Sequence, residues 1–172
     1  MDYRWRKQKK QSVWKGIAAG VIGGLAAAYT MSKFEEVYGK ASRSLIGKEP
    51  RAGEGEDPTI KTANKLSRTF AGHGLGRSEK KRASTIVHYA FASALGGVYG
   101  GAAEVAPVLK KMCGVPFGAA VFVGAEDVAL PMLKLSKKPW EYPVPRHLSL
   151  LGAHCVYGLT TELVRRGVRR VF

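Results

Sequence analysis

The chain has 172 residues, of which 45% are hydrophobic, and a formal net charge of +15. This length suits one domain with a modest core, and a content of two cysteines, Cys113 and Cys155, excludes a disulfide framework and a cysteine-type zinc knuckle. The positive charge gathers at both ends and between apolar stretches rather than along one amphipathic face. We therefore expect contact with lipid headgroups and no binding of nucleic acid.

The first apolar stretch, residues 13–32, follows a basic start. Its length suits one bilayer crossing, although a basic start and a short apolar core also fit a cleaved signal peptide, and that alternative stays open. We favour a retained helix because glycines recur in it every four residues, a spacing that lets another helix approach closely. These glycines are Gly16, Gly20 and Gly24.

A polar connection, residues 33–83, comes next and is too long for a plain loop. Its segment EPRAGEGEDP has the composition of a flexible acidic linker. After the linker, Ile60, Ala63, Leu66 and Phe70 recur near helical spacing among basic residues. This pattern predicts a short amphipathic helix that lies on the bilayer surface.

The second predicted crossing covers residues 84–106 and is rich in small residues. Four-residue spacing recurs in it, so this helix should pack closely against the glycines of the first crossing. The small residues concerned are Gly96, Gly97, Gly100 and Gly101.

The third predicted crossing, residues 115–133, contains two adjacent carboxylates, Glu126 and Asp127. Charged side chains inside a bilayer are tolerated mainly when they face the bundle interior, find a partner or take a proton. The two acids are therefore candidate functional residues.

The fourth predicted crossing, residues 147–166, is mostly apolar, holds two histidines and ends in an arginine cluster. Such a cluster is typical of a cytoplasmic helix end, and basic residues at both termini favour an even number of crossings. We expect both termini to be cytoplasmic.

Together these elements predict a single membrane domain, residues 1–172, that is an all-α, polytopic, antiparallel four-helix transmembrane bundle with a short amphipathic helix in its first long loop. A rise of about 1.5 Å per residue puts ionisable groups from three helices at one depth. This polar intramembrane layer consists of His88, Glu126, Asp127, His147 and His154. A second polar layer lies toward the opposite surface and consists of Glu104, Glu162, Arg165 and Arg166.

Three roles stay open for the first layer. Its side chains could hydrogen-bond neighbouring helices and fix their register, or form a pathway for protons or small ions. They could also bind a divalent metal through His88, Glu126 or Asp127, and His154, because imidazole and carboxylate together suit zinc, iron or manganese. The sequence contains no GxSxG elbow, P-loop, HExxH or cysteine quartet, so we expect no enzymatic activity.

Two spacings match a known family. His88 is followed by a phenylalanine three, a tyrosine eleven and a glutamate sixteen residues later, and His154 is followed by a glutamate eight residues later and then by a double arginine. With the segments GAEDVALP and EYPVPRH, the chain from about Pro58 to Arg170 resembles the YagU-like family of bacterial inner-membrane proteins, a domain of unknown function. The resemblance implies a four-helix inner-membrane protein with cytoplasmic ends and assigns no reaction.

We therefore expect a structural or accessory protein of the bacterial inner membrane, whose polar layer handles protons or small ions. A membrane metalloprotein and a small subunit of a larger membrane complex are the alternatives. The expected partners are the lipid bilayer and, through the glycine faces, a second copy or another membrane protein.

Overall fold

A computed structural model describes residues 2–46 and 57–171, with side chains described from residue 12 to residue 44 and from residue 57 onward. The described residues are helical with short turns and contain no strand, as the all-α prediction requires. Most of the predicted acidic linker, residues 49–56, lies outside the described part.

Helix α1 (Asp2–Ile46) is much longer than the predicted crossing at residues 13–32. The prediction ended the helix where the sequence turns polar, at Lys33. Polar residues continue the helix there because Glu36 accepts from Lys33 at 2.9 Å and from Lys40 at 2.7 Å, and such pairs one turn apart stabilise a helix. The predicted polar loop therefore begins as helix.

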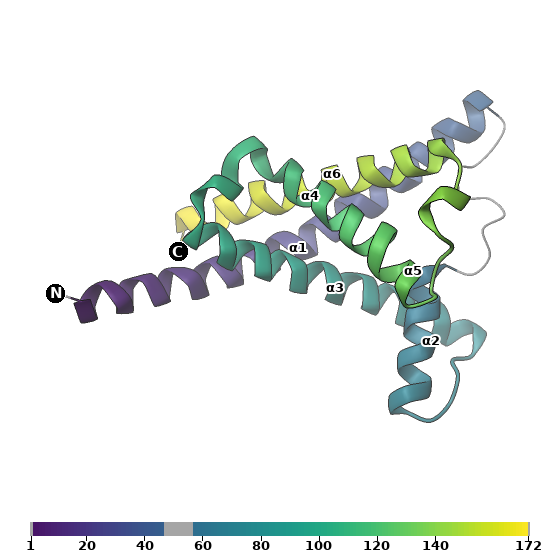
Figure 1. The fold of residues 1–172 in the computed structure, drawn as a ribbon, viewed down its shortest axis with the longest axis horizontal. Helices are drawn as coiled ribbons and strands as arrows, with labels where there is room; N and C mark the ends of the chain where they lie inside the picture. Colours follow the sequence, from purple (N-terminus) through teal and green to yellow (C-terminus); the bar gives the residue numbers. More distant parts are fainter. Residues whose placement is uncertain (1, 47–56, 172) are drawn as a thin grey trace.

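Helix α2 (Pro58–Phe70) lies where amphipathic spacing predicted a helix. It begins sharply because Asp57 Oδ1 accepts a hydrogen bond from the Thr59 amide at 2.8 Å, while the proline at the first helical position needs no partner for an amide. Helix α3 (Arg77–Val105) then starts seven residues earlier than predicted. The α2 helix packs against α3 and runs across the direction of the longer helices (Figure 1).

The third predicted crossing, residues 115–133, is not one regular α-helix. After the tight turn η1 (Pro107–Gly114), the chain forms α4 (Val115–Phe122), a wider π-helical segment η2 (Val123–Ala129) and the short α5 (Leu130–Met132). In η2 the Leu130 amide donates to Ala125 O, five residues back. Pro131 explains the widening, because it has no amide proton to continue the α-helical ladder.

The last helix, α6 (Val144–Val171), follows a short turn η3 (Pro139–Glu141) and exceeds its predicted bounds at both ends. Helix α1 packs against both α3 and α6, and α4 also packs against α6. The long helices alternate in direction, so both chain ends lie at one end of the molecule (Figure 1). We call this the terminal end, and the end that carries α2 and α5 the distal end.

Small residues bring α1 against α3 until the two backbones touch. A Cβ atom added at Gly16 would lie 2.6 Å from the Gly100 carbonyl oxygen, and atoms added at Gly20 and Gly24 would meet the carbonyl oxygens of Gly96 and Ala92. Gly97 and Gly101 face the side chains of Val21 and Ile17 on α1. All seven glycines expected to allow close helix packing therefore lie buried between α1 and α3.

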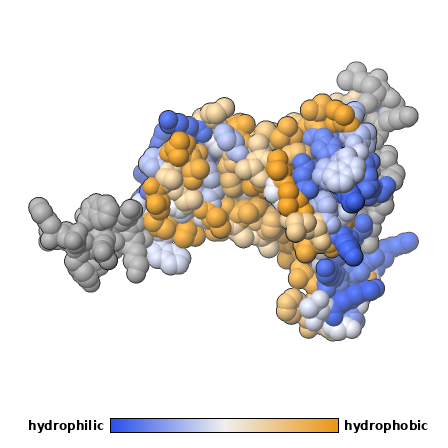
Figure 2. Space-filling model, in the orientation of Figure 1, coloured by the Kyte–Doolittle hydropathy of each residue, from blue (hydrophilic) through white to orange (hydrophobic). Residues whose placement is uncertain are grey.

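Many large apolar side chains lie on the surface rather than in the interior. Buried residues are mostly small or polar, and the two largest fully buried side chains are Glu162 and Thr161. Large apolar side chains are exposed, and on the face that Figure 2 shows, hydrophobic residues form a band across the middle of the molecule, with hydrophilic residues toward its ends. Examples of these exposed residues are Ile22, Leu25, Ile86, Phe91, Val98, Val123, Leu159 and Leu163.

Two helical stretches of the described residues are long and apolar enough to cross a membrane, Ser12–Ser44 and Pro107–Met132. Helices α3 and α6 do not reach the same hydropathy, although both were predicted as crossings. Glycine, serine, tyrosine and histidine reduce their mean hydropathy, and several of these residues, such as Gly96, Tyr99, Ser149 and His154, are buried.

Candidate functional site

The described residues carry two polar sites, one at each end of the bundle. The first is an ion-pair cluster at the terminal end, centred on Glu162 of α6. The Glu162 side chain has no exposed surface, and Arg165 binds both of its oxygens, with Nε at 2.6 Å and Nη2 at 3.0 Å. Arg166 adds a third bond from Nε at 2.7 Å. A buried carboxylate is thus fully paired by two guanidinium groups one turn away on its own helix.

Glu104, near the end of α3, is the second carboxylate of the cluster. Its oxygens accept from Arg165 Nη1 at 3.2 Å, from Arg169 Nε at 2.9 Å and from Ser12 Oγ at 2.8 Å. Ser12 belongs to α1, so this one carboxylate joins three helices. Arg165 bridges the two carboxylates, and its side chain is 3% exposed.

The cluster also holds the turn between α3 and α4. Arg166 Nη2 donates to the Lys110 carbonyl oxygen at 2.6 Å, and the Tyr99 hydroxyl donates to Leu109 O at 3.1 Å. Three successive residues of this turn, Met112, Cys113 and Gly114, have positive φ angles of 55°, 52° and 81°. Non-glycine residues rarely adopt that conformation, so the hydrogen bonds to the turn offset a local backbone cost.

The structure brings together all four residues of the predicted second polar layer, Glu104, Glu162, Arg165 and Arg166. It adds Ser12 and Arg169, which the prediction missed. Arg169 could have been found from spacing, since it lies seven residues after Glu162 and so on nearly the same helix face. Every carboxylate oxygen of this cluster has a cationic or hydroxyl partner, an arrangement that suits a structural lock.

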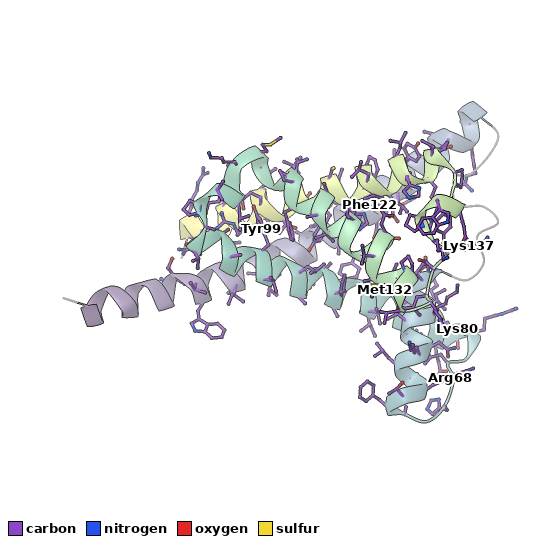
Figure 3. The ribbon with its side chains drawn as sticks, in the orientation of Figure 1. Arg68, Lys80, Tyr99, Phe122, Met132 and Lys137 are labelled. Atoms are coloured by element: carbon purple, nitrogen blue, oxygen red, sulfur yellow. The ribbon has the colours of Figure 1, made fainter. Side chains whose placement is uncertain are left out.

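The predicted first layer lies toward the distal end and divides into two groups. In one, His147 Nε2 lies 3.4 Å from Asp127 Oδ1, which joins α6 to η2. The buried ring of Phe122 is in edge-to-face contact with both His147 and His154, with ring centroids 6.1 Å and 5.6 Å apart. Figure 3 shows Phe122 between α4 and α6.

In the other group, His88, Glu126 and His154 line a common cavity of about 560 Å³. It lies between α3, η2 and α6, with residues of α1 and α2 also in its lining, and Arg146 and Tyr157 line it from α6. His154 is 6% exposed, and its Nδ1 donates to Leu150 O at 2.8 Å.

A metal site is the next question, because three members of the predicted ligand set, His88, Glu126 and His154, line this cavity. No cluster of three or more histidine, cysteine, aspartate or glutamate side chains that could hold a metal ion occurs among the described residues. The metal alternative through His88, Glu126 or Asp127, and His154 thus has no support from the geometry.

Comparison with known proteins gives a family and no activity. Residues 57–163, more than half of the chain, match the family described as "Protein of unknown function (DUF1440)". The chain belongs to this family. No significant match was found among curated proteins or among solved structures.

The DUF1440 region covers the distal polar residues but only part of the ion-pair cluster. It begins at the residue that caps α2 and ends just after Glu162. Ser12, Arg165 and Arg169 lie outside it, as does all of α1. The cluster therefore connects the DUF1440 region to a helix that precedes it.

Sequence reasoning also missed the glycines of the α4 and α6 contact. Cβ atoms added at Gly114 and Gly118 would meet the carbonyl oxygens of Gly158 and His154 on α6. A further missed glycine, Gly23 of α1, also contacts α6, since a Cβ atom there would lie 2.6 Å from Thr161 O. The signal was present, because Gly114 and Gly118 repeat the four-residue spacing of the α1 glycines.

Proposed function

We propose that this DUF1440 protein is an integral membrane protein that crosses the bilayer four times, through α1, α3, the α4 to α5 segment and α6. The observation that carries this proposal is the exposure of large apolar side chains around a core of small and charged residues. In water that distribution would oppose folding, whereas in lipid the apolar band is solvated and buried polar groups strengthen helix contacts.

Three further features support a bilayer around this band. Trp14 lies toward the terminal end and Trp140 toward the distal end, and both are exposed, as aromatic residues at a membrane interface are. Helix α2 runs across the bundle axis, which would place it parallel to the membrane plane (Figure 1). Its exposed Leu66 and Phe70 alternate with basic residues, which suits an interfacial helix.

The biochemical role that we propose is structural or accessory and non-enzymatic. The ion-pair cluster and the glycine contacts fix α1 onto the DUF1440 region, so the chain behaves as one packed unit. The glycine faces of α1 and α3 are covered by each other within the chain. The structure therefore does not support association with a partner through these faces. The resemblance of the sequence to bacterial inner-membrane proteins supports that membrane as the location, with both termini cytoplasmic.

Site-directed labelling tests the four crossings. Single cysteines replace Lys111, Gly72, Lys137 or Arg170 in a chain whose Cys113 and Cys155 are serine, and a membrane-impermeant maleimide is applied to intact spheroplasts and to inverted vesicles. We expect Lys111→Cys and Arg170→Cys to react in inverted vesicles, and Gly72→Cys and Lys137→Cys in spheroplasts. Labelling of all four positions from one side, or recovery of the protein in the soluble fraction, would overturn the proposal.

Proton or small-ion handling is a second candidate function. It is favoured by the Asp127 and His147 pair and by the titratable groups along the distal cavity. In proteoliposomes with an imposed potential, a pH-sensitive dye should report faster proton entry with wild-type protein than with Glu126→Gln. Rates equal to those of protein-free liposomes would reject this role and leave the accessory role.

A further inference from the structure

The distal cavity is an amphipathic slot. Apolar side chains line it from α3 and from the α4 to α5 segment, among them Phe91, Leu95, Val121, Ala125 and Leu130. Its lining on α3 extends from Ser84 to Leu95, a length of about 16 Å at the helical rise. The volume of about 560 Å³ lies in the range of small-molecule binding sites.

The slot exists because α3 and α4 separate after the η1 turn. Helix α4 packs on α6, whereas α3 packs on α1, so the faces of α3 and η2 that look toward each other are not closed by direct helix packing. One edge of the slot is open to the surroundings, since the lining residues Phe91 and Leu133 are each 54% exposed. Both belong to the hydrophobic surface, so the open edge faces the proposed lipid phase.

Polar groups gather toward the distal end of the slot. Arg146 lines it with only 6% exposure, and its guanidinium carbon lies over the Tyr142 ring, 3.3 Å from the ring centroid. This contact holds the guanidinium group at the slot. His88, one turn inward from Ser84, has a buried Nε2 atom with no hydrogen-bond partner among the described residues. A ligand oxygen at that point would satisfy it.

Acidic side chains line other parts of the slot. Asp57 is exposed at the rim and already accepts from Thr59, and Glu35 is half-buried on α1. Glu126 is half-buried on the η2 wall. An anionic group would therefore bind on the α6 side, against Arg146.

We propose that this slot binds one acyl-chain amphiphile with an anionic carboxylate or phosphate headgroup. The chain lies between α3 and η2, and the headgroup contacts Arg146 and His88. The inference rests on the proposed bilayer location, because the open edge of the slot would admit the chain from lipid.

Native mass spectrometry of delipidated protein in detergent tests the slot. The protein is incubated with palmitate or with dipalmitoyl phosphatidylglycerol, and the expected product is a single one-to-one adduct. Leu95→Trp and Ala125→Trp fill the slot from opposite walls and should abolish the adduct. Arg146→Gln should raise the Kd roughly tenfold through loss of a charged hydrogen-bond donor. Leu159→Trp, on the outer face of α6, is the matched control and should keep the adduct.

The outcomes separate the sources of the headgroup. An adduct with palmitate alone identifies a fatty acid, one with the phospholipid alone identifies a lipid headgroup, and both support the shared chemistry. The absence of an adduct with either probe overturns the proposal. Equal adducts in wild type and in both tryptophan variants also overturn it, because they indicate lipid bound to the protein surface. Displacement by inorganic phosphate would show a simple anion site and also overturn it. The maleimide labelling described above tests the four crossings separately. A labelling pattern that contradicts the four crossings would reject the proposed topology and leave the result on lipid adducts unchanged.

Discussion

Arg165 and Glu162 form a bidentate ion pair, 2.6 Å and 3.0 Å long, in which the two side chains are 3% and 0% exposed. Removing one partner of such a pair leaves an uncompensated buried charge, which costs more than the pair itself contributes. Arg165 also donates to Glu104, so losing Arg165 would remove a contact between α6 and α3 as well.

Replacing the central carboxylate should therefore destabilise the bundle strongly. We expect Glu162→Gln to lower the free energy of unfolding by roughly 3–5 kcal/mol, because the buried Arg165 loses its bidentate partner and Arg166 loses its ion pair. The measurement is thermal unfolding in detergent followed by helical circular dichroism. Glu36→Gln is the matched control, since Glu36 also pairs with two cations one turn away but at the exposed surface, and its midpoint should not change. Equal midpoints for the two variants would contradict the buried lock.

A side chain at the contact of α1 and α3 should force the helices apart. Gly20→Leu should lower the free energy of unfolding by roughly 1–3 kcal/mol, because even a Cβ atom at Gly20 would meet the backbone of Gly96. Gly124→Leu is the control, since a Cβ atom at Gly124 meets nothing within 4 Å. Thermal unfolding of both variants checks the prediction, and a Gly20→Leu protein as stable as wild type would count against it.

The buried ring of Phe122 should be a major packing element of the distal region. Phe122→Ala leaves a cavity beside His147 and His154 and should lower the free energy of unfolding by roughly 3–5 kcal/mol. Phe70→Ala removes the same atoms from a residue that is 84% exposed and should leave the unfolding midpoint near that of wild type. Similar losses in the two variants would show that Phe122 is not packed as described.

Much of this arrangement could be predicted from the sequence, because helix contacts through small residues leave a spacing signal. Gly16, Gly20 and Gly24 indicated the α3 contact, and the eight-residue separation of His154 and Glu162 indicated two polar regions on α6. The continuation of α1 to Ile46 was missed, because the prediction followed hydropathy and Lys33 to Lys40 is polar. The slot was not predicted, since it depends on α4 packing on α6 rather than on α3, and the spacing of Gly114 and Gly118 indicates a close contact without naming the partner helix.

The amphipathic helix α2 should depend on its cap. Asp57→Ala removes the acceptor for the Thr59 amide and should destabilise the first turn by about 0.5–2 kcal/mol. Hydrogen exchange of the α2 amides, measured by mass spectrometry, should become faster while that of α6 is unchanged. Asp57→Asn keeps an acceptor oxygen and should retain most of the protection. Unchanged exchange in Asp57→Ala would argue against the cap.

The link between Glu104 and Arg169 has a consequence for biosynthesis. The two residues are 65 positions apart, so a ribosome that adds 5–20 residues per second completes Arg169 about 3–13 s after Glu104. During that interval Glu104 has Ser12 within reach but neither arginine of α6. The nascent helices α1 and α3 can meet early through their glycines, yet the charge at their shared end is balanced only when α6 arrives. A translational pause before Arg165 would prolong this stage and expose an unneutralised carboxylate to the insertion and quality-control machinery.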